Sequence, residues 1–218
     1  MSIAVLNRTL QFPDAHRANP QGLVAVGGDL SLERLLLAYR SGIFPWTVAP
    51  ISWWSPDPRA ILEYDQLHIP DSLKKILRRE VFQVTIDSAF AQVIEKCAAR
   101  EPRRPDTWIT PEFIAAYTQL HERGHAHSLE CWQDGELAGG IYGVAIGGFF
   151  SGESMFHLVS NASKVALCHL VEHLQKRKFA LLDIQMLTPV TRQMGGTTIP
   201  RSEYLERLAE AVELEREF

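Results

Sequence analysis

The sequence predicts an α+β protein, with a small N-terminal α+β domain over residues 1–62 and a C-terminal domain over residues 63–218 in which helices cover a mixed sheet. Residues up to about 60 are rich in Pro, Gly and Trp, and a more regular pattern follows. Turn signals at 133–135 and 147–148 divide residues 126–156 into three strands, after which a helix leads to one more strand. Because a strand reached through a helical crossover pairs in parallel, the sheet is expected to be mixed.

In the N-terminal domain we expect one helix, capped by Asp29 or Ser31 and ended by Gly42. Its apolar face is formed by Leu32, Leu35, Leu36 and Tyr39. Residues 51–62 then read as strand, turn and strand, with two prolines in the turn.

The C-terminal domain alternates helices and strands. We expect helices over residues 70–80, 88–100, 110–124, 161–179 and 201–217, and strands over 81–87, three segments of 126–156, and 180–187. The order of a β-meander, a crossover helix and a further strand resembles the GNAT acyltransferase architecture. That resemblance concerns the fold, and a fold alone does not assign a function.

Composition excludes several classes of protein. The net charge of −4 argues against a polybasic nucleic-acid binder, although a local basic patch remains allowed. Three distant cysteines, Cys97, Cys131 and Cys168, form no CxxC pair, so we expect reduced thiols and a cytoplasmic protein. No stretch approaches the roughly 18–20 apolar residues of a membrane span. His121 and His125 are four apart but lie on either side of a helix-ending glycine, so no metal site is expected.

Two polar residues interrupt the apolar strand "LLDIQML". Asp183 and Gln185 are two apart, so they point to the same face of a strand. They either form a buried hydrogen-bond pair that braces a neighbouring loop, or form a catalytic pair at the mouth of the sheet.

Glu153 lies in the apolar stretch "GGFFSGESMF". On a regular strand it shares a face with Phe149, Ser151 and Met155. Burial of an unpaired carboxylate is costly, so Glu153 is expected either to form an internal salt bridge or to receive a cationic substrate group. The sequence alone leaves both interpretations open.

Basic residues gather in two places. Lys74, Lys75, Arg78 and Arg79 lie on one short predicted helix, and three arginines within residues 100–104 precede Trp108. Charge runs are usually solvated faces, but basic runs beside a tryptophan also fit contact with an RNA backbone and a stacked base.

Together these segments resemble the leucyl/phenylalanyl-tRNA–protein transferase family. The resemblance is carried, in chain order, by "GLVAVGGDLS", "YRSGIFPW", "WWSPDPRA", "TWIT", "GHAHSLE", "SGESMF", "NASK" and "LLDIQ". It implies transfer of Leu or Phe, with Met as a further candidate, from aminoacyl-tRNA to proteins whose first residue is Arg or Lys. In bacteria this transfer marks such proteins for degradation.

The resemblance also implies roles for individual residues. Asp183 and Gln185 match the catalytic pair, and Glu153 matches a glutamate near the acceptor peptide. Trp46 and Trp108 match the aromatic residues that hold the terminal adenosine of the tRNA. The pocket for the leucyl or phenylalanyl side chain corresponds to Phe150, Met155, Leu167, Leu174 and Ile141. Strand alternation puts Phe150 opposite Glu153, so either a bulge near Gly152 re-aims it or it does not line the pocket.

The chemistry that the resemblance implies needs no cofactor, because the ester of an aminoacyl-tRNA is already activated. We expect Gln185 to accept a hydrogen bond from the attacking amine while Asp183 polarises Gln185 or holds it in place. Lys74, Lys75, Arg78 and Arg79 would contact the tRNA backbone. Two alternatives remain: another GNAT-fold acyltransferase, using acetyl-CoA or acting on peptidoglycan, and a non-catalytic tRNA-binding module. The crossover helix opens with "SNASK" and lacks the glycine-rich turn of acetyl-CoA enzymes, which argues against the former.

Overall fold

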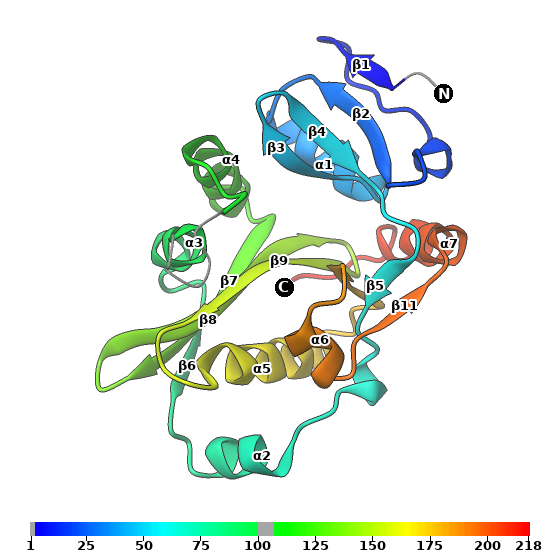
Figure 1. Ribbon diagram of the computed structural model, residues 1–218. Helices are drawn as coiled ribbons and strands as arrows, with labels where there is room; N and C mark the ends of the chain where they lie inside the picture. Colours follow the sequence, from blue (N-terminus) through cyan, green and yellow to red (C-terminus); the bar gives the residue numbers. More distant parts are fainter. Residues whose placement is uncertain (1–2, 100–106) are drawn as a thin grey trace.

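The computed structural model describes residues 3–99 and 107–218, which form two sheets and their covering helices (Figure 1). The strands are β1 (Ala4–Leu6), β2 (Leu23–Gly27), β3 (Phe44–Val48), β4 (Ile51–Trp54), β5 (Arg59–Ile61), β6 (Gln83–Ile86), β7 (Ala126–Gln133), β8 (Glu136–Ile146), β9 (Phe149–His157), β10 (Leu181–Gln185) and β11 (Thr197–Ile199). The helices are α1 (Leu32–Arg40), α2 (Asp71–Arg78), α3 (Phe90–Ala98), α4 (Pro111–Glu122), α5 (Ala162–Lys176), α6 (Pro189–Gln193) and α7 (Arg201–Ala211), with 3₁₀ turns η1 (Ala15–Arg17) and η2 (Tyr64–Gln66). The predicted α+β class is confirmed.

The N-terminal unit is a four-stranded sheet in the order β1-β2-β4-β3. Its helix α1 begins after Ser31, as the capping pattern predicts, and buries Leu35, Ala38 and Tyr39. Figure 1 shows this unit above the larger sheet. Its core is continuous with the core on the α3 and α4 side of that sheet, so the two units pack against one another.

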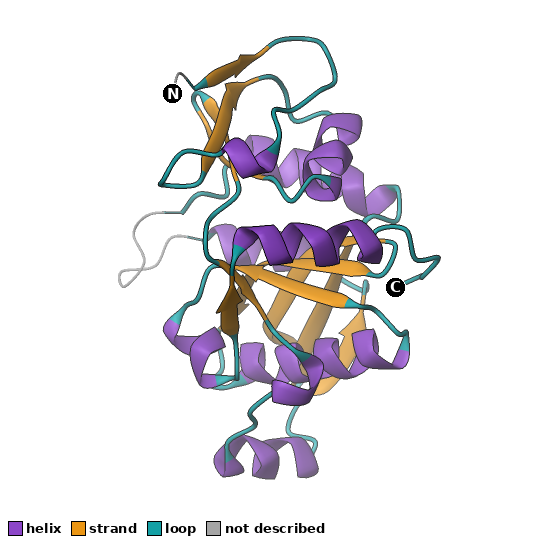
Figure 2. Cartoon of the chain, turned by 90° about the vertical axis from the view of Figure 1, so that its right-hand side faces the viewer, coloured by secondary structure: helices purple, strands orange, loops and turns teal. Residues whose placement is uncertain are grey.

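The larger sheet has seven strands in the order β11-β5-β10-β9-β8-β7-β6. The predicted meander is confirmed, since β7, β8 and β9 pair antiparallel in sequence order. The predicted crossover is also confirmed, since β10 pairs with β9 in parallel after α5. Helices lie on both sides of the sheet (Figure 2). The buried residues of α5 belong to the core on one side, and those of α3 belong to the core on the other.

The predicted strand, turn and strand over residues 51–62 are confirmed as β4, a proline-containing turn and β5. The two strands belong to different sheets, since β4 pairs with β2 and β3, whereas β5 pairs with β10 and β11. The proline-containing connection therefore carries the chain from one sheet to the other. As a result β5, which precedes the predicted boundary at residue 62, is part of the larger sheet.

Strand β9 contains a bulge at Glu153. Tyr142 of β8 pairs with Ser154 and Gly143 pairs with Gly152, so Glu153 is the extra residue between them. An extra residue shifts the alternation of all side chains that follow it. Met155 accordingly packs in the core on the α5 side, and Phe156 packs in the core on the α3 side. The expectation that Met155 shares a face with Glu153 is therefore wrong.

Strands β9 and β10 separate just before this bulge. Their pairing runs from Leu181 opposite Phe149 to Asp183 opposite Ser151, and β9 then continues past β10 to His157, still paired with β8. The separation leaves a gap between two parallel strands of the sheet, next to Glu153 and Gln185.

Candidate functional site

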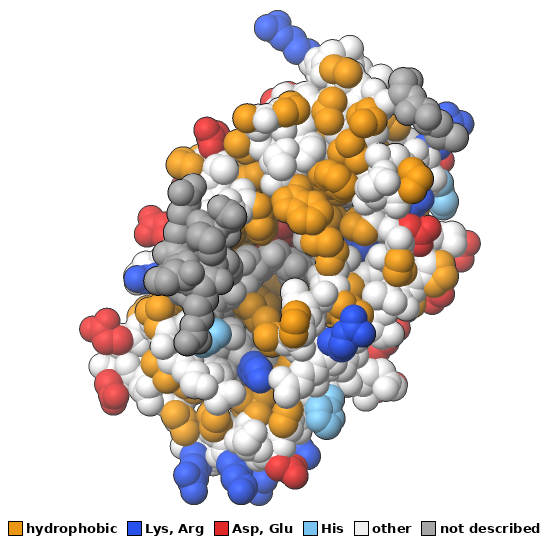
Figure 3. All heavy atoms as spheres, in the orientation of Figure 1, with side chains coloured by type: hydrophobic (Ala, Val, Ile, Leu, Met, Phe, Trp, Pro, Cys, Tyr) orange, Lys and Arg blue, Asp and Glu red, His pale blue; other side chains and the backbone are white. Residues whose placement is uncertain are grey.

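A cavity of about 400 Å³ lies where β9 and β10 separate. Its polar side includes Glu153 from β9 and Gln185 from the end of β10. Figure 3 shows apolar side chains gathered across the middle of this face, where the N-terminal unit meets the larger sheet. The volume is within the range of small-ligand sites.

Asp183 is held in a buried ion pair with Arg59 of β5. The Arg59 Nε and Nη2 atoms donate to the two carboxylate oxygens at 2.9 and 2.6 Å, and both side chains are at most 1% exposed. The Tyr204 hydroxyl donates a further bond of 3.0 Å to Asp183. Burial alone would lower the pKa of Arg59, but the Asp183 carboxylate raises the pKa above its ordinary value, so the guanidinium stays charged.

The backbone of Gln185 is fixed by Asp183. Its N–H donates to Asp183 Oδ1 at 2.8 Å, and its φ of 57° lies in the left-handed region that non-glycine residues rarely adopt. Such a conformation persists where its surroundings stabilise it. Asp183 does not line the cavity whereas Gln185 does, so Asp183 contacts this site through the Gln185 main chain.

The Glu153 carboxylate is surrounded by hydrogen-bond donors. Its Oε1 accepts bonds from Ser151 Oγ at 3.0 Å and Gln185 Nε2 at 2.9 Å, and its Oε2 accepts one from the Tyr117 hydroxyl at 3.2 Å. Over residues 3–99 and 107–218 we find no ion pair to Glu153. An internal salt bridge within this part of the chain is therefore not what holds Glu153.

Burial raises the pKa of Glu153 to about 7, although the hydrogen bonds from Ser151 and Gln185 act in the opposite direction. The nearby negative charge of Asp183 adds to the increase. Near neutral pH this carboxyl therefore exchanges between its acid and its anion. A positive group entering the cavity would favour the anion.

The Gln185 amide is oriented by Glu153. Because its Nε2 donates to a carboxylate oxygen, its Oε1 is left for other partners, and none of the hydrogen bonds among the described residues uses that oxygen. The amide carbonyl is therefore available as an acceptor in the cavity.

The predicted side-chain pocket is partly assembled in this cavity. Ile141, Met155 and Leu167 line it, together with Ile184 and Val190, which the sequence interpretation did not single out. Trp46 of β3 and Trp108 also line it, and Trp46 packs edge-on against Trp54 at a centroid distance of 5.4 Å. Cavity and aromatic residues thus come from both units of the fold.

Phe150 and Leu174 lie elsewhere. Both are fully buried in the core on the α5 side, with Ile141 and Leu167, but neither lines the cavity. Phe150 stays on the face opposite Glu153, because the bulge follows it in the chain and re-aims Met155 instead. The two side chains therefore belong to the apolar core that also contains Ile141 and Leu167.

The basic residues of α2 lie away from this cavity. Lys74, Lys75, Arg78 and Arg79 are exposed, and Lys74 pairs with Asp71 at 3.1 Å. Figure 3 shows basic side chains at the lower end of the molecule, where α2 lies in Figure 1. The basic run at 100–104 lies outside the described residues.

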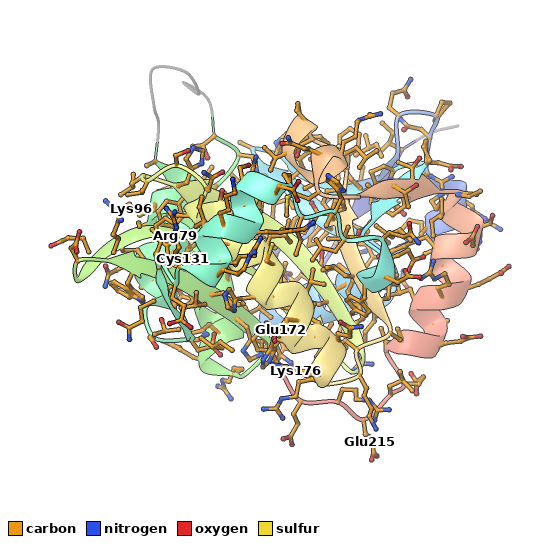
Figure 4. All side chains as sticks on the ribbon, turned by 90° about the horizontal axis from the view of Figure 1, so that it is seen from below. Arg79, Lys96, Cys131, Glu172, Lys176 and Glu215 are labelled. Carbon is orange, nitrogen blue, oxygen red and sulfur yellow. The ribbon has the colours of Figure 1, made fainter. Side chains whose placement is uncertain are left out.

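A larger cavity of about 900 Å³ separates α2 from α5 and β6. Figure 4 views this side of the molecule, with Arg79 at the end of α2 and the paired Glu172 and Lys176 on α5. None of the residues predicted for catalysis or substrate binding lines it.

Sequence reasoning missed Arg59, Tyr117 and Tyr204, which hold the carboxylates of Asp183 and Glu153. The general signal was available, since a buried carboxylate requires partners. The sequence did not reveal which residues these partners are, because Arg59 and Tyr117 lie 124 and 36 residues along the chain from the carboxylates that they contact.

Comparison with known proteins identifies the family. The profile of the leucyl/phenylalanyl-tRNA protein transferases matches residues 61–209, and that of their N-terminal domain matches residues 28–57. This chain belongs to that family. It is therefore an aminoacyltransferase that moves an aminoacyl group from tRNA to protein.

Relatives with the name leucyl/phenylalanyl-tRNA–protein transferase are identical to this chain at about half of the aligned residues. The proteins of Syntrophobacter fumaroxidans and Azotobacter vinelandii are each 52% identical, over 97% and 94% of this chain and 92% and 93% of their own length. That of Syntrophotalea carbinolica is 52% identical over 97% of this chain and 93% of its own.

Two solved structures are distantly similar to the chain. L-PGS from Bacillus licheniformis has a TM-score of 0.41 at 12% identity, covering 77% of this chain and 54% of that one. A ribosomal-protein-alanine N-acetyltransferase from Brucella melitensis has a TM-score of 0.36 at 15% identity, covering 51% and 86%. Within the described part of the chain no helix is long and apolar enough to cross a membrane, and no three side chains gather as metal ligands.

Proposed function

We propose that this protein transfers Leu or Phe, with Met as a further candidate donor, from aminoacyl-tRNA to the α-amine of proteins that begin with Arg or Lys. Such transfer would mark these proteins for degradation, and it would take place in the cytoplasm, where aminoacyl-tRNA is made. The observation that carries the proposal is the cavity between β9 and β10, which combines tryptophans, an apolar wall and the Glu153–Gln185 pair.

The donor end of the tRNA is proposed to enter beside Trp46 and Trp108. A purine base stacks on an aromatic ring, and the attached aminoacyl side chain would then lie against Ile141, Met155 and Leu167. Such a wall selects by size and shape. Similar apolar side chains would be discriminated weakly, because one methylene is worth only about 1–3 kcal/mol.

The acceptor amine would be positioned by Gln185. Its Oε1, left free by the bond from Nε2 to Glu153, would accept a hydrogen bond from the attacking nitrogen. The new C–N bond forms as the bond from the carbonyl carbon to the ribose oxygen breaks. The amine loses one proton and the leaving oxygen gains one, so the transfer is neutral in protons. In model peptides the α-amine has a pKa of about 7.7–8.0, so an appreciable fraction is neutral at pH 7 and positioning can supply much of the rate.

Asp183 and Arg59 are proposed to act through Gln185 rather than on the substrates. Their ion pair is buried, and Asp183 fixes the unusual backbone conformation of Gln185. The anion of Glu153 would attract the positive side chain of an N-terminal Arg or Lys, in addition to orienting Gln185.

A single reaction tests the proposal. The protein is incubated with Leu-tRNA carrying labelled leucine and with a peptide that begins with Arg, while a peptide that begins with Ala serves as control. We expect label on the Arg peptide and little on the Ala peptide. Equal labelling of both would refute the acceptor specificity, and labelling of neither would refute the proposed transfer.

A further inference from the structure

A separate cavity of about 460 Å³ opens at the start of α5. It shares Met155 and Val190 with the candidate active site, so the two cavities adjoin along β9 and α6. The rest of its wall comes mainly from the turn before α5 and from the first turn of that helix. No predicted substrate role accounts for these polar residues.

The N-terminus of α5 has no side-chain cap. The N-cap residue, Asn161, has a φ of 73° and makes no capping hydrogen bond. We find no acceptor among the described residues for the backbone amides of Ser163 and Lys164. Free amides and the dipole of a 15-residue helix favour an anion at this end.

Ser163 gives an independent indication of a ligand. Its side chain lines the cavity although the residue is only 6% exposed. Within residues 3–99 and 107–218 its hydroxyl makes no hydrogen bond. Ser163 Oγ is not among the fully buried unpaired atoms, so this hydroxyl is accessible at the cavity and can donate to an incoming acceptor.

The charge of this cavity selects the ligand. Lys164 and His157 line it, and none of its described lining residues is a carboxylate. The Lys164 ammonium donates to the neutral Gln193 amide oxygen at 3.0 Å, and no ion pair to it is found in the described part of the chain. An ammonium, a hydroxyl and a helix N-terminus together match the oxygens of a phosphate group.

We propose that this cavity binds a phosphodiester of the 3′ end of the donor tRNA. The inference rests on the proposed function, which puts the terminal adenosine beside Trp46 and Trp108. A phosphodiester is attached to the ribose of that adenosine, so the group must lie within one nucleotide of the aminoacyl ester. The cavity at the start of α5 meets this requirement, because it adjoins the candidate active site.

The test compares two small donors that differ by one phosphodiester: 3′-O-leucyl-adenosine, and the same compound with a methyl phosphate on its 5′ oxygen. The measured quantity is kcat/KM for transfer to a peptide that begins with Arg. We expect the wild-type protein to prefer the phosphodiester donor by about tenfold, as for a hydrogen-bonded charge. In Lys164→Met and in Ser163→Ala this preference should fall to about threefold or less, whereas Lys164→Arg should keep most of it.

Lys96→Met is the matched control, because Lys96 is an exposed lysine on α3 that does not line the cavity. It should keep the wild-type preference. A preference in Lys164→Met equal to that of the wild type would overturn the inference. So would equal inhibition of both donors by inorganic phosphate with no preference between them, since that result describes a site for a free anion. Failure of every donor, intact Leu-tRNA included, would instead refute the proposed function.

Discussion

Glu153 should make the stability of this protein depend on pH in a way that Glu153→Gln removes. Burial raises the pKa of this carboxyl from 4.5 to about 7. A carboxyl whose pKa is higher in the folded state binds its proton more tightly there, so its ionisation destabilises the folded protein. The stability that the protonated carboxyl contributes to the folded state is fully present below about pH 4.5, and it is lost as the pH rises through about 7.

The expected size follows from the two pKa values. The interval from 4.5 to about 7, at about 1.4 kcal/mol per pH unit, corresponds to about 3 kcal/mol. Gln is nearly isosteric with Glu and can keep the bonds from Ser151 and Gln185, so it serves as the non-titrating reference. The free energy of unfolding is measured by urea denaturation of both proteins across this pH range.

The difference between the two curves isolates Glu153, because the histidines and other carboxyls titrate in both proteins. We expect the wild type to lose about 3 kcal/mol relative to Glu153→Gln between about pH 4.5 and 8. Parallel curves would refute the reasoning, since they would mean that the carboxyl has the same proton affinity in the folded and unfolded chains. In transfer assays, kcat/KM for an Arg peptide should rise through about pH 7 more steeply in the wild type than in the variant.

Three further perturbations address the rest of the site. Arg59→Met should lower the free energy of unfolding by about 3–5 kcal/mol in urea denaturation, because Asp183 would be left buried without its cation. Trp46→Ala should raise the KM for Leu-tRNA by about five- to 150-fold in steady-state assays, as expected for loss of a stacked base worth about 1–3 kcal/mol. Lys74→Glu combined with Arg78→Glu should raise the same KM and reduce its dependence on salt, whereas Lys96→Glu should change neither.

Each of these has an outcome that contradicts it. Wild-type stability of Arg59→Met would mean that the ion pair between Arg59 and Asp183 does not stabilise the fold. An unchanged KM in Trp46→Ala would remove the stacking role, and matching effects of the α2 pair and the Lys96 control would leave α2 as a solvated face.

Local patterns were sufficient for most of the fold. The spacing of apolar residues in α1, and the turn signals that bound β7, β8 and β9, act between neighbours in the chain, so the sequence predicts them. The destination of β5 could not be predicted in this way. Its pairing with β10 joins segments more than a hundred residues apart and depends on the contact between Arg59 and Asp183.

The candidate site, like the fold, could be predicted only in part from the sequence. Alternation correctly brought Asp183 and Gln185 to one side of β10, where both contact Ser151. It gave the wrong neighbour for Glu153, because a one-residue bulge has no reliable signature in a stretch such as "SGESMF". The pKa of Glu153 was equally out of reach, since it depends on burial among Tyr117, Ser151 and Gln185, which come from three different elements.

The bulge and the strand separation explain why the polar residues gather at this point. A regular β9 paired with β10 throughout would satisfy its backbone within the sheet and leave no cavity. Because β10 leaves β9 after Asp183, Gln185 turns into a left-handed conformation, and the extra residue in β9 brings the Glu153 carboxylate to the Gln185 amide. The Asp183–Arg59 pair stabilises the conformation of Gln185, and Tyr117 and Ser151 hold the Glu153 carboxylate at the bulge. The unusual backbone and the buried carboxylate, which both cost free energy, thus occur at Gln185 and Glu153. These are the residues proposed to orient the hydrogen-bond acceptor for the attacking amine.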